Sequence, residues 1–298
     1  MANSLKQLID DSYIHGKYTY STFRKVSATA ATAGYWVDLS MTTGNPVPNY
    51  YVGSELMATV PLNWYKKSIW HGGAVSPNKK YLHKICMFCG SAAGAPCPFQ
   101  LCDYLMFYPL IDMDNTDEQF FTNYGTEVTT TTDPGAAVLP RYTEGAGVNA
   151  ILVATNPYVG GAYFQISYTN QNGVAGSISK VALTNTSTNI GTLVNSHTAG
   201  VNRYGAFIEL AYGDTGIRSV QSITFSAPNG GLAALVLLKP IATMMTMETT
   251  AWAEFDFVTH KPSLPRIYDG AYLNFLAMPS ATIAAIPIIG EITTIWGS

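Results

Sequence analysis

The second half of the chain is a succession of short apolar or β-branched runs separated by turn residues. Residues 163–168 alternate between apolar and polar positions, which is typical of a half-buried strand. Residues 232–238 are apolar throughout, as expected for a central strand covered on both faces. The runs expected to form strands are 148–155, 163–169, 177–183, 206–212, 220–226, 232–238, 252–259, 271–278 and 291–296. Turn-bounded strands in this number predict a β-sandwich of the jelly-roll type.

The first part of the chain has a different pattern. Residues 4–13 predict a short amphipathic helix, with Leu5, Leu8 and Ile9 on one face. Residues 27–33 are small and uncharged, which suggests an extended segment. We therefore expect an N-terminal arm that is ordered by neighbouring molecules.

Residues 35–125 predict a mixture of elements. The runs 35–39 and 80–88 are expected to form strands. Residues 98–111 place their apolar side chains on a helical face that ends near Pro109, so a helix is expected there.

Three regions follow from these patterns. Residues 1–34 form the predicted arm, 35–125 a mixed α+β segment, and 126–298 the sandwich, which strands from 35–125 could complete. The predicted fold class is mainly β, a jelly-roll-like β-sandwich with an N-terminal arm and a short helix-containing segment. Two uncharged stretches, 27–33 and 271–290, are expected to be buried within the sandwich or against neighbouring molecules.

Charge is sparse along the whole chain. It has 16 Lys+Arg and 19 Asp+Glu in 298 residues, or 12% charged, against about 25% in an ordinary soluble domain. A monomer of this size would expose on the order of 12,000 Å², which is one charged side chain per about 350 Å² of surface. This density favours a surface that is covered by other protein.

The distribution of charge and apolar residues also argues against two classes of partner. The densest basic pairs are Lys66-Lys67 and Lys79-Lys80. Binding to a nucleic acid backbone requires larger clusters of Lys and Arg, so we expect no nucleic acid partner. The most apolar stretch, 271–290, is interrupted by Pro279 and Pro287, which favours strands over a membrane-spanning helix. The first residues lack the pattern of a signal peptide, so we expect synthesis in the cytoplasm.

Four cysteines lie close together in the sequence. Cys86 and Cys89 form a C-x2-C pair, and Cys97 and Cys102 follow in C-x4-C spacing. A tetrahedral zinc site usually combines two C-x2-C pairs. Buried thiols are the favoured interpretation, with a metal site and a disulfide as alternatives.

Other patterns carry little chemistry. The acidic run 112–118 lacks the glycine and glutamate positions of an EF-hand, so a turn followed by a helix is favoured over a calcium site. The G-x-G-x-x-A match at 145–150 precedes a strand, where a dinucleotide site needs a helix. The sequence contains no G-x-S-x-G, P-loop or H-E-x-x-H motif. We expect no cofactor and no enzymatic activity.

Aromatic residues are numerous, at 12% of the chain with 19 Tyr. Tyr and Trp combine a large contact area with a polar tip, which suits protein interfaces and stacking on sugars. Most of them are expected in the core. Near the predicted turn at 213–216, Asp214 can cap the turn, and Arg218 either pairs with a carboxylate at a subunit contact or is solvated.

Two groups of segments carry a resemblance to a known class of proteins. The first comprises 35–40, 44–51, 71–72, 79–82, 103–109 and 111–112, and the second comprises 213–222, 235–240 and 267–273. Over roughly residues 35–280 the chain resembles virion structural proteins of tailed bacteriophages. The resemblance implies a part of the phage particle built on a β-sandwich, and it does not assign the part to head, collar or tail.

The sequence therefore leads to one main hypothesis and one alternative. The main hypothesis is a non-enzymatic capsid decoration or accessory protein of the virion, a homo-oligomer that binds the major capsid protein or other virion proteins. The alternative is a protein of the tail or adsorption apparatus that binds glycan on the host surface. A carbohydrate-active enzyme would need two carboxylates across a cleft. The candidate interface residues are Tyr35, Trp36, Asp214, Arg218, Tyr268 and Tyr272.

Overall fold

A computed structural model gives the structure of the protein. It describes residues 4–26, 31–64, 67–90, 95–123, 126–133, 139–186, 189–196, 205–249, 251–260, 263–285 and 287–297. The chain is mainly β, and its strands form three large antiparallel sheets and one small two-stranded sheet. The predicted fold class, a mainly β, jelly-roll-like sandwich with a short helix, is confirmed.

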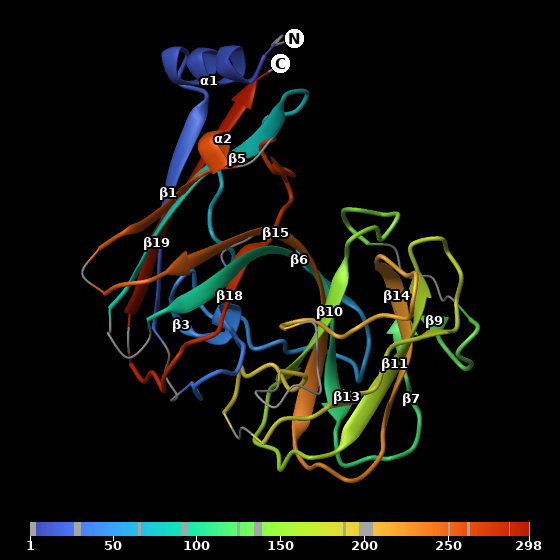
Figure 1. The fold of residues 1–298 in the computed structure, drawn as a ribbon. Helices are drawn as coiled ribbons and strands as arrows, with labels where there is room; N and C mark the ends of the chain where they lie inside the picture. The colour runs from blue at the N-terminus through green and yellow to red at the C-terminus, as the bar shows by residue number, and fades with distance from the viewer. Residues whose placement is uncertain are drawn as a thin grey trace.

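The sheet that contains both ends of the chain, the terminal sheet, has the strand order β16-β5-β19-β1-β3, with β17 also paired to β5. Its strands are β1 (Tyr18–Val26), β3 (Thr43–Asn45), β5 (Lys79–Cys89), β16 (Ala253–Asp256), β17 (Arg266–Ile267) and β19 (Pro287–Gly297). Two helices lie beside it, α1 (Leu5–Ile14) and α2 (Phe257–His260). In Figure 1, α1 lies across one end of this sheet, close to both termini.

The central sheet has the order β10-β15-β6-β18-β2, with β4 also paired to β6. Its strands are β2 (Val37–Asp38), β4 (Val60–Pro61), β6 (Cys97–Asp112), β10 (Asn149–Ala154), β15 (Leu232–Thr246) and β18 (Leu273–Ala277). The outer sheet, in the order β12-β11-β14-β7 with β13 on β11, contains β7 (Gln119–Phe120), β11 (Tyr163–Asn170), β12 (Ser177–Ile178), β13 (Ala182–Leu183) and β14 (Ile217–Phe225). The small sheet pairs β8 (Thr122–Asn123) with β9 (Thr126–Glu127).

The central sheet is shared by two sandwiches. The terminal sheet packs on one end of β6 and β15, and the outer sheet packs on the other end, so the two long strands arch from one lobe to the other (Figure 1). Phe99 and Leu101 of β6 contribute to the first core, and Leu105 and Tyr108 contribute to the second. The opposite face of the central sheet is covered by loops, which form a third core around Tyr104.

The long strands β6 and β15 bend where their pairing changes register. Shifts occur between Ala233 and Leu235, between Leu237 and Leu238, and between Pro240 and Ala242. An extra residue at a β-bulge bends the strand and increases its twist. Pro240, which has no N–H to donate to a ladder, lies at one of these shifts. The bulges therefore allow one strand pair to serve two cores.

The helix expected at residues 98–111 is wrong, because this segment forms most of β6. Nearly every side chain of β6 is buried, since the strand pairs with β15 and β18 and is covered on both faces. Burial on both faces removes the two-residue alternation, so the apolar positions fit a helical pattern equally well. Pro109 and Leu110, which has a φ of 60°, mark an irregularity in the strand rather than a helix end.

The N-terminal region differs from the expected arm. The predicted helix is confirmed as α1, whose N-cap Ser4 accepts a hydrogen bond from the Gln7 N–H. The next residues form β1, which pairs along its whole length with β19 of the same chain. Residues 27–30 of the predicted arm lie outside the described residues, and Ala31 is buried.

The remaining predictions for the strands have mixed outcomes. Strands occur as expected within 80–88, 148–155, 163–169, 220–226 and 291–296. The run 206–212 is irregular, and 252–259 forms β16 followed by α2. In the uncharged stretch 271–290, residues 271–277 are buried, whereas Ser280, Thr282, Ala284 and Ala285 are exposed. No helix in the described ranges is long and apolar enough to span a bilayer.

A buried carboxylate fixes the short helix η1 (Leu39–Met41) next to β2. Asp38 accepts hydrogen bonds from the Ser40 N–H at 2.8 Å, the Ser40 hydroxyl at 2.6 Å, the Tyr104 hydroxyl at 2.8 Å and the Tyr51 hydroxyl. Burial raises the pKa of Asp38, and these donors oppose that shift. The carboxylate thus joins the loop after β2 to β6.

A buried ion pair joins the central sheet to the loop at Arg141. The Arg141 guanidinium donates to both oxygens of Asp103, at 2.8 and 2.7 Å, and it also donates to the backbone oxygens of Leu62 and Tyr104. Asp103 also accepts from the Tyr272 N–H at 2.9 Å. One pair therefore holds β6, the segment before β18 and two loops together.

We predict that Asp103→Ala lowers the free energy of unfolding by about 3–5 kcal/mol, because it leaves the buried Arg141 charge without its partner. Urea unfolding measures the change. The matched control is Glu144→Ala, which breaks an ion pair of the same 2.7 Å length to Arg218 at the surface and is expected to cost at most about 1 kcal/mol. Equal losses in the two variants would contradict the structural role of the buried pair.

Candidate interaction surface

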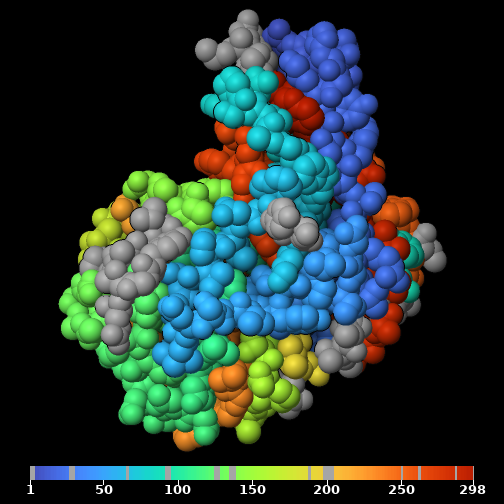
Figure 2. Space-filling view, turned by 180° about the vertical axis from the view of Figure 1, so that it is seen from behind, coloured from blue at the N-terminus to red at the C-terminus, as the bar shows by residue number. Residues whose placement is uncertain are grey.

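Three exposed aromatic side chains gather between β4 and β5 and around the loop after β17. Trp64 and Trp70 meet edge to face, with ring centroids 4.9 Å apart. Their exposures are 38% and 46%, and that of Tyr268 is 38%. We call these three residues the tryptophan patch. Figure 2 shows that the segment containing the two tryptophans, in light blue to cyan, lies in the middle of the rear face.

A backbone hydrogen bond joins the two loops of the patch, and neighbouring side chains pack on Tyr268. The Trp64 N–H donates to the Gly270 carbonyl at 3.2 Å, which brings the two loops together. Tyr268 packs edge to face on Tyr142 at 4.9 Å, and the Arg266 guanidinium lies 5.2 Å from the Tyr268 ring centre. An arginine above a tyrosine ring adds a cation–π attraction.

Arg141 links the patch to the core. Its guanidinium donates to the side-chain oxygen of Asn63 at 3.1 Å, next to Trp64. The same guanidinium makes the buried ion pair with Asp103 on β6. The position of the loop that carries Trp64 is therefore set by the central sheet.

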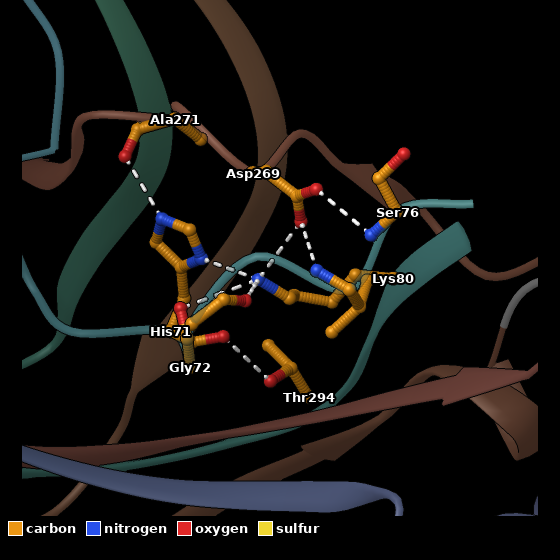
Figure 3. Close-up of polar contacts among 9 residues, drawn as sticks. His71, Gly72, Ser76, Lys80, Asp269, Ala271 and Thr294 are labelled. Carbon is orange, nitrogen blue, oxygen red and sulfur yellow. Dashed lines mark hydrogen bonds and ion pairs between the residues drawn. The ribbon is translucent and has the colours of Figure 1, made fainter. Parts of the chain in front are cut away.

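A polar cluster lies next to Trp70, whose ring stacks on that of His71. Figure 3 shows His71, Lys80 and Asp269 of this cluster. The Lys80 ammonium on β5 donates to the Gly73 carbonyl at 2.7 Å and to the Gly72 carbonyl at 3.3 Å, and it lies 3.4 Å from the Asp269 carboxylate. Asp269 accepts in turn from the backbone N–H groups of Val75 and Ser76. The cluster thus fixes the loop after Trp70 against the loop after Tyr268.

His71 occupies the centre of this cluster. Its Nε2 lies 2.9 Å from the Ala271 carbonyl, which can only accept, so Nε2 carries the proton. Its Nδ1 then accepts from the Lys80 ammonium at 3.2 Å. The Thr294 hydroxyl of β19 donates to the His71 carbonyl at 3.0 Å. The ring and the backbone of His71 are both held, and the neighbouring Trp70 ring stacks on it at 6.5 Å.

Burial sets the ionisation of the cluster. Burial and the adjacent Lys80 charge together lower the pKa of His71 to about 4, so the imidazole is neutral at pH 7. Burial also lowers the pKa of Lys80, and the Asp269 carboxylate opposes that shift. The Lys80 side chain is 0% exposed, so a substrate in solution has no access to its nitrogen. The cluster thus supports the surface above it.

The structure distributes the candidate interface residues over different environments. Tyr268 belongs to the tryptophan patch. Tyr272, at 2% exposure, is part of the core and does not form a surface. Tyr35 and Trp36 are half-buried, and the Trp36 N–H donates to the Ser196 hydroxyl at 2.8 Å.

The turn predicted near Asp214 is present. The Asp214 carboxylate accepts from the Tyr168 hydroxyl at 2.7 Å and from the Asn170 side chain at 2.8 Å. Arg218 pairs with Glu144 of the same chain at 2.7 Å and also donates to the Gln171 carbonyl. The carboxylate partner of Arg218 is therefore intramolecular.

The four cysteines are free thiols. Cys89, Cys97 and Cys102 are buried and Cys86 is half-buried. Burial raises the pKa of Cys86 to about 11, and the nearby Glu254 adds to the shift. In the part of the chain that the structure describes, no group of three or more His, Cys, Asp or Glu side chains could hold a metal ion.

The acidic run 112–118 forms turns. The Asp114 N–H donates to the Asp112 carboxylate and the Asp117 N–H to the Asn115 side chain, both at 2.9 Å. The expected helix after this turn is absent, since β7 follows.

The sequence reasoning missed Trp64, Trp70 and the His71–Lys80–Asp269 cluster. Asp269 lies far from Lys80 in the sequence, and only the pairing of β17 with β5 brings them together. The available signal was the pair of tryptophans six positions apart in a loop rich in polar residues. A large aromatic residue in such a loop does not belong to a strand pattern that would predict its burial.

Comparison with known proteins assigns no family. No family model matches the chain, and no curated protein matches it. Among solved structures, the chain is similar to one titled "Structure of infectious bursal disease virus Gt strain", with 8% identity, a TM-score of 0.18, and coverage of 94% of this chain and 80% of that one. It is also similar to "The 2.6A structure of Infectious Bursal Virus Derived T=1 Particles", with 8% identity, a TM-score of 0.19, and coverage of 94% and 77%. TM-scores below 0.2 carry no argument about fold or function.

We predict that the stability of the protein falls on acidification through His71. Because its pKa is about 4 in the folded chain and 6.5 ordinarily, the unfolded chain binds more protons below pH 6.5. This difference removes about 2 kcal/mol of stability between pH 7 and pH 5. His71→Gln is expected to lose that part of the pH dependence in urea unfolding.

The control for this prediction is His260→Gln, which changes an exposed histidine. The control should keep the pH dependence of the original protein. The same dependence in the His71 variant and the original protein would show that His71 titrates normally.

Proposed function

We propose that this chain is a structural protein of a virion, a decoration or accessory component that attaches to shell proteins through the tryptophan patch. The observation that carries the proposal is the exposure of Trp64 and Trp70 beside backbone that is held by buried hydrogen bonds and ion pairs. Trp, Tyr and Arg dominate the binding energy of protein interfaces. The resemblance to tailed-phage virion proteins supports a role in the particle of a tailed phage.

The support under the patch favours binding by preorganised side chains. In the described part of the chain, the backbone beside the three aromatic residues is held by Lys80, His71 and Arg141 without a partner. Side chains that are already ordered lose less conformational entropy on binding. Binding to the assembled shell would then stabilise the shell by mass action, since the bound state is favoured over the separate parts.

We also propose that the protein is not an enzyme. Three titratable groups with shifted pKa values, Asp38, Asp103 and His71, are buried in the protein. Each of them has hydrogen-bond partners that join separate segments of the chain. These contacts account for the three groups as parts of the fold.

The ring geometry favours a protein partner over a glycan. The planes of Trp64 and Trp70 are inclined by 60°, so the two rings do not offer one flat platform for successive sugars. An angular pair of rings fits a pocket on another protein, as interface anchors do. A role in glycan binding by a tail protein remains the alternative outcome of the experiment.

We predict that the double variant Trp64→Ala/Trp70→Ala weakens binding to shells that lack this protein by about 1,000-fold, because each anchor contributes on the order of 2 kcal/mol, which is about 30-fold. Cosedimentation with purified shells measures the binding. The control, Trp252→Ala, removes a tryptophan of 58% exposure that packs on Phe88 instead. Unchanged binding by the double variant, or binding of the protein to a glycan array and not to shells, would contradict the proposal.

A further inference from the structure

In the described part of the chain, one side of β1 is open along most of its length. β1 pairs with β19 from Tyr18 to Val26. On its other side, among the described residues, it pairs with β3 only from Arg24 to Val26. Figure 1 shows β1 at the outer margin of the terminal sheet. Residues 18–23 therefore form a sheet edge.

The alternation of the antiparallel ladder shows which backbone groups face this edge. The Trp296 N–H donates to the Lys17 carbonyl, so odd-numbered residues of β1 bond towards β19. The even-numbered residues Tyr18, Tyr20 and Thr22 then direct their N–H and C=O groups outwards. Within the described residues, these outward groups have no backbone partner.

This edge lacks the usual protection against pairing. Exposed edges in soluble proteins are commonly blunted by Lys, Pro or a bulge. Residues 18–23 contain no charged residue and no proline, and their register with β19 has no shift. The burial of Ser21 and Phe23 against the sandwich holds the strand straight and orients its free groups. The edge is thus a preformed template for another strand.

We propose that this edge pairs with the same edge of a second copy, antiparallel and centred on Tyr20. In that register Tyr20 lies opposite Tyr20 of the second copy, and Tyr18 lies opposite Thr22. All three open residues on each copy gain partners, as an isologous two-fold contact requires. The two terminal sheets become one continuous sheet. This inference does not rest on a role in a virion.

The neighbouring residues select both the partner and the register. With Tyr20 at the centre, Lys17 lies opposite Phe23, and Arg24 keeps its pairing with Asn45 of β3, so no like charges meet. A centre at Tyr18 would require the Gly16 N–H, which already donates to the Tyr13 carbonyl. A centre at Thr22 would require the outward groups of Arg24, which pair with β3. Self-pairing at Tyr20 uses every free group of this edge.

Disulfide trapping tests the register in a Cys86→Ser background, because Cys86 is the one cysteine of the four that is not buried. Tyr20→Cys should form a cross-linked dimer under mild oxidation, since directly opposite residues have Cα atoms about 5.5 Å apart, within disulfide range. Tyr18→Cys and Thr22→Cys should each stay monomeric alone, because their own copies lie about 14 Å apart. An equimolar mixture of those two variants should cross-link.

Sedimentation equilibrium provides the second measurement. The original protein should dimerise, and Tyr20→Lys should raise the dimer dissociation constant at least about tenfold by placing like charges opposite each other. Tyr163→Lys, at a position of similar exposure on the outer sheet, is the control and should leave the constant unchanged. A monomeric original protein, no Tyr20→Cys cross-link, or equal cross-linking of Thr22→Cys alone would overturn the inference. Loss of shell binding with the dimer intact would contradict only the proposed function.

Discussion

The continuous pairing of β6 with β15 is the constraint on which the rest of the structure depends. These two strands contribute side chains to all three cores, so neither sandwich has a core independent of them. The register shifts along the pair supply the bend that brings one end under the terminal sheet and the other under the outer sheet. The two lobes are therefore expected to unfold together.

The positions of the aromatic rings in the tryptophan patch depend on β6 and on β5 of the terminal sheet. Asp103 on β6 holds Arg141, and Arg141 holds Asn63 beside Trp64. On the other side, Lys80 on β5 holds His71 beside Trp70. The exposed rings thus lie beside buried charged groups that are paired within the chain. Several of the few charged residues of this protein are buried, which leaves even fewer on the surface.

The sequence predicts those elements whose local pattern survives in the fold. α1 has an apolar face and a Ser N-cap, and β11 and β14 follow turn signals, so all three were predictable. β6 was not, because burial on both faces removes its alternation. β1 was missed because its buried positions include Ser21 and Lys25 while Tyr20 is exposed, so its polarity does not follow its burial. The His71–Lys80–Asp269 cluster depends on contacts between distant segments, which no local pattern records.

Electron cryo-microscopy of the virus particle would show whether the charge-poor surface of this chain is covered by other protein. We expect density for this fold on the shell, with Trp64 and Trp70 buried against a shell protein. A particle without this chain, or one in which the chain is bound with both tryptophans facing solvent, would contradict it.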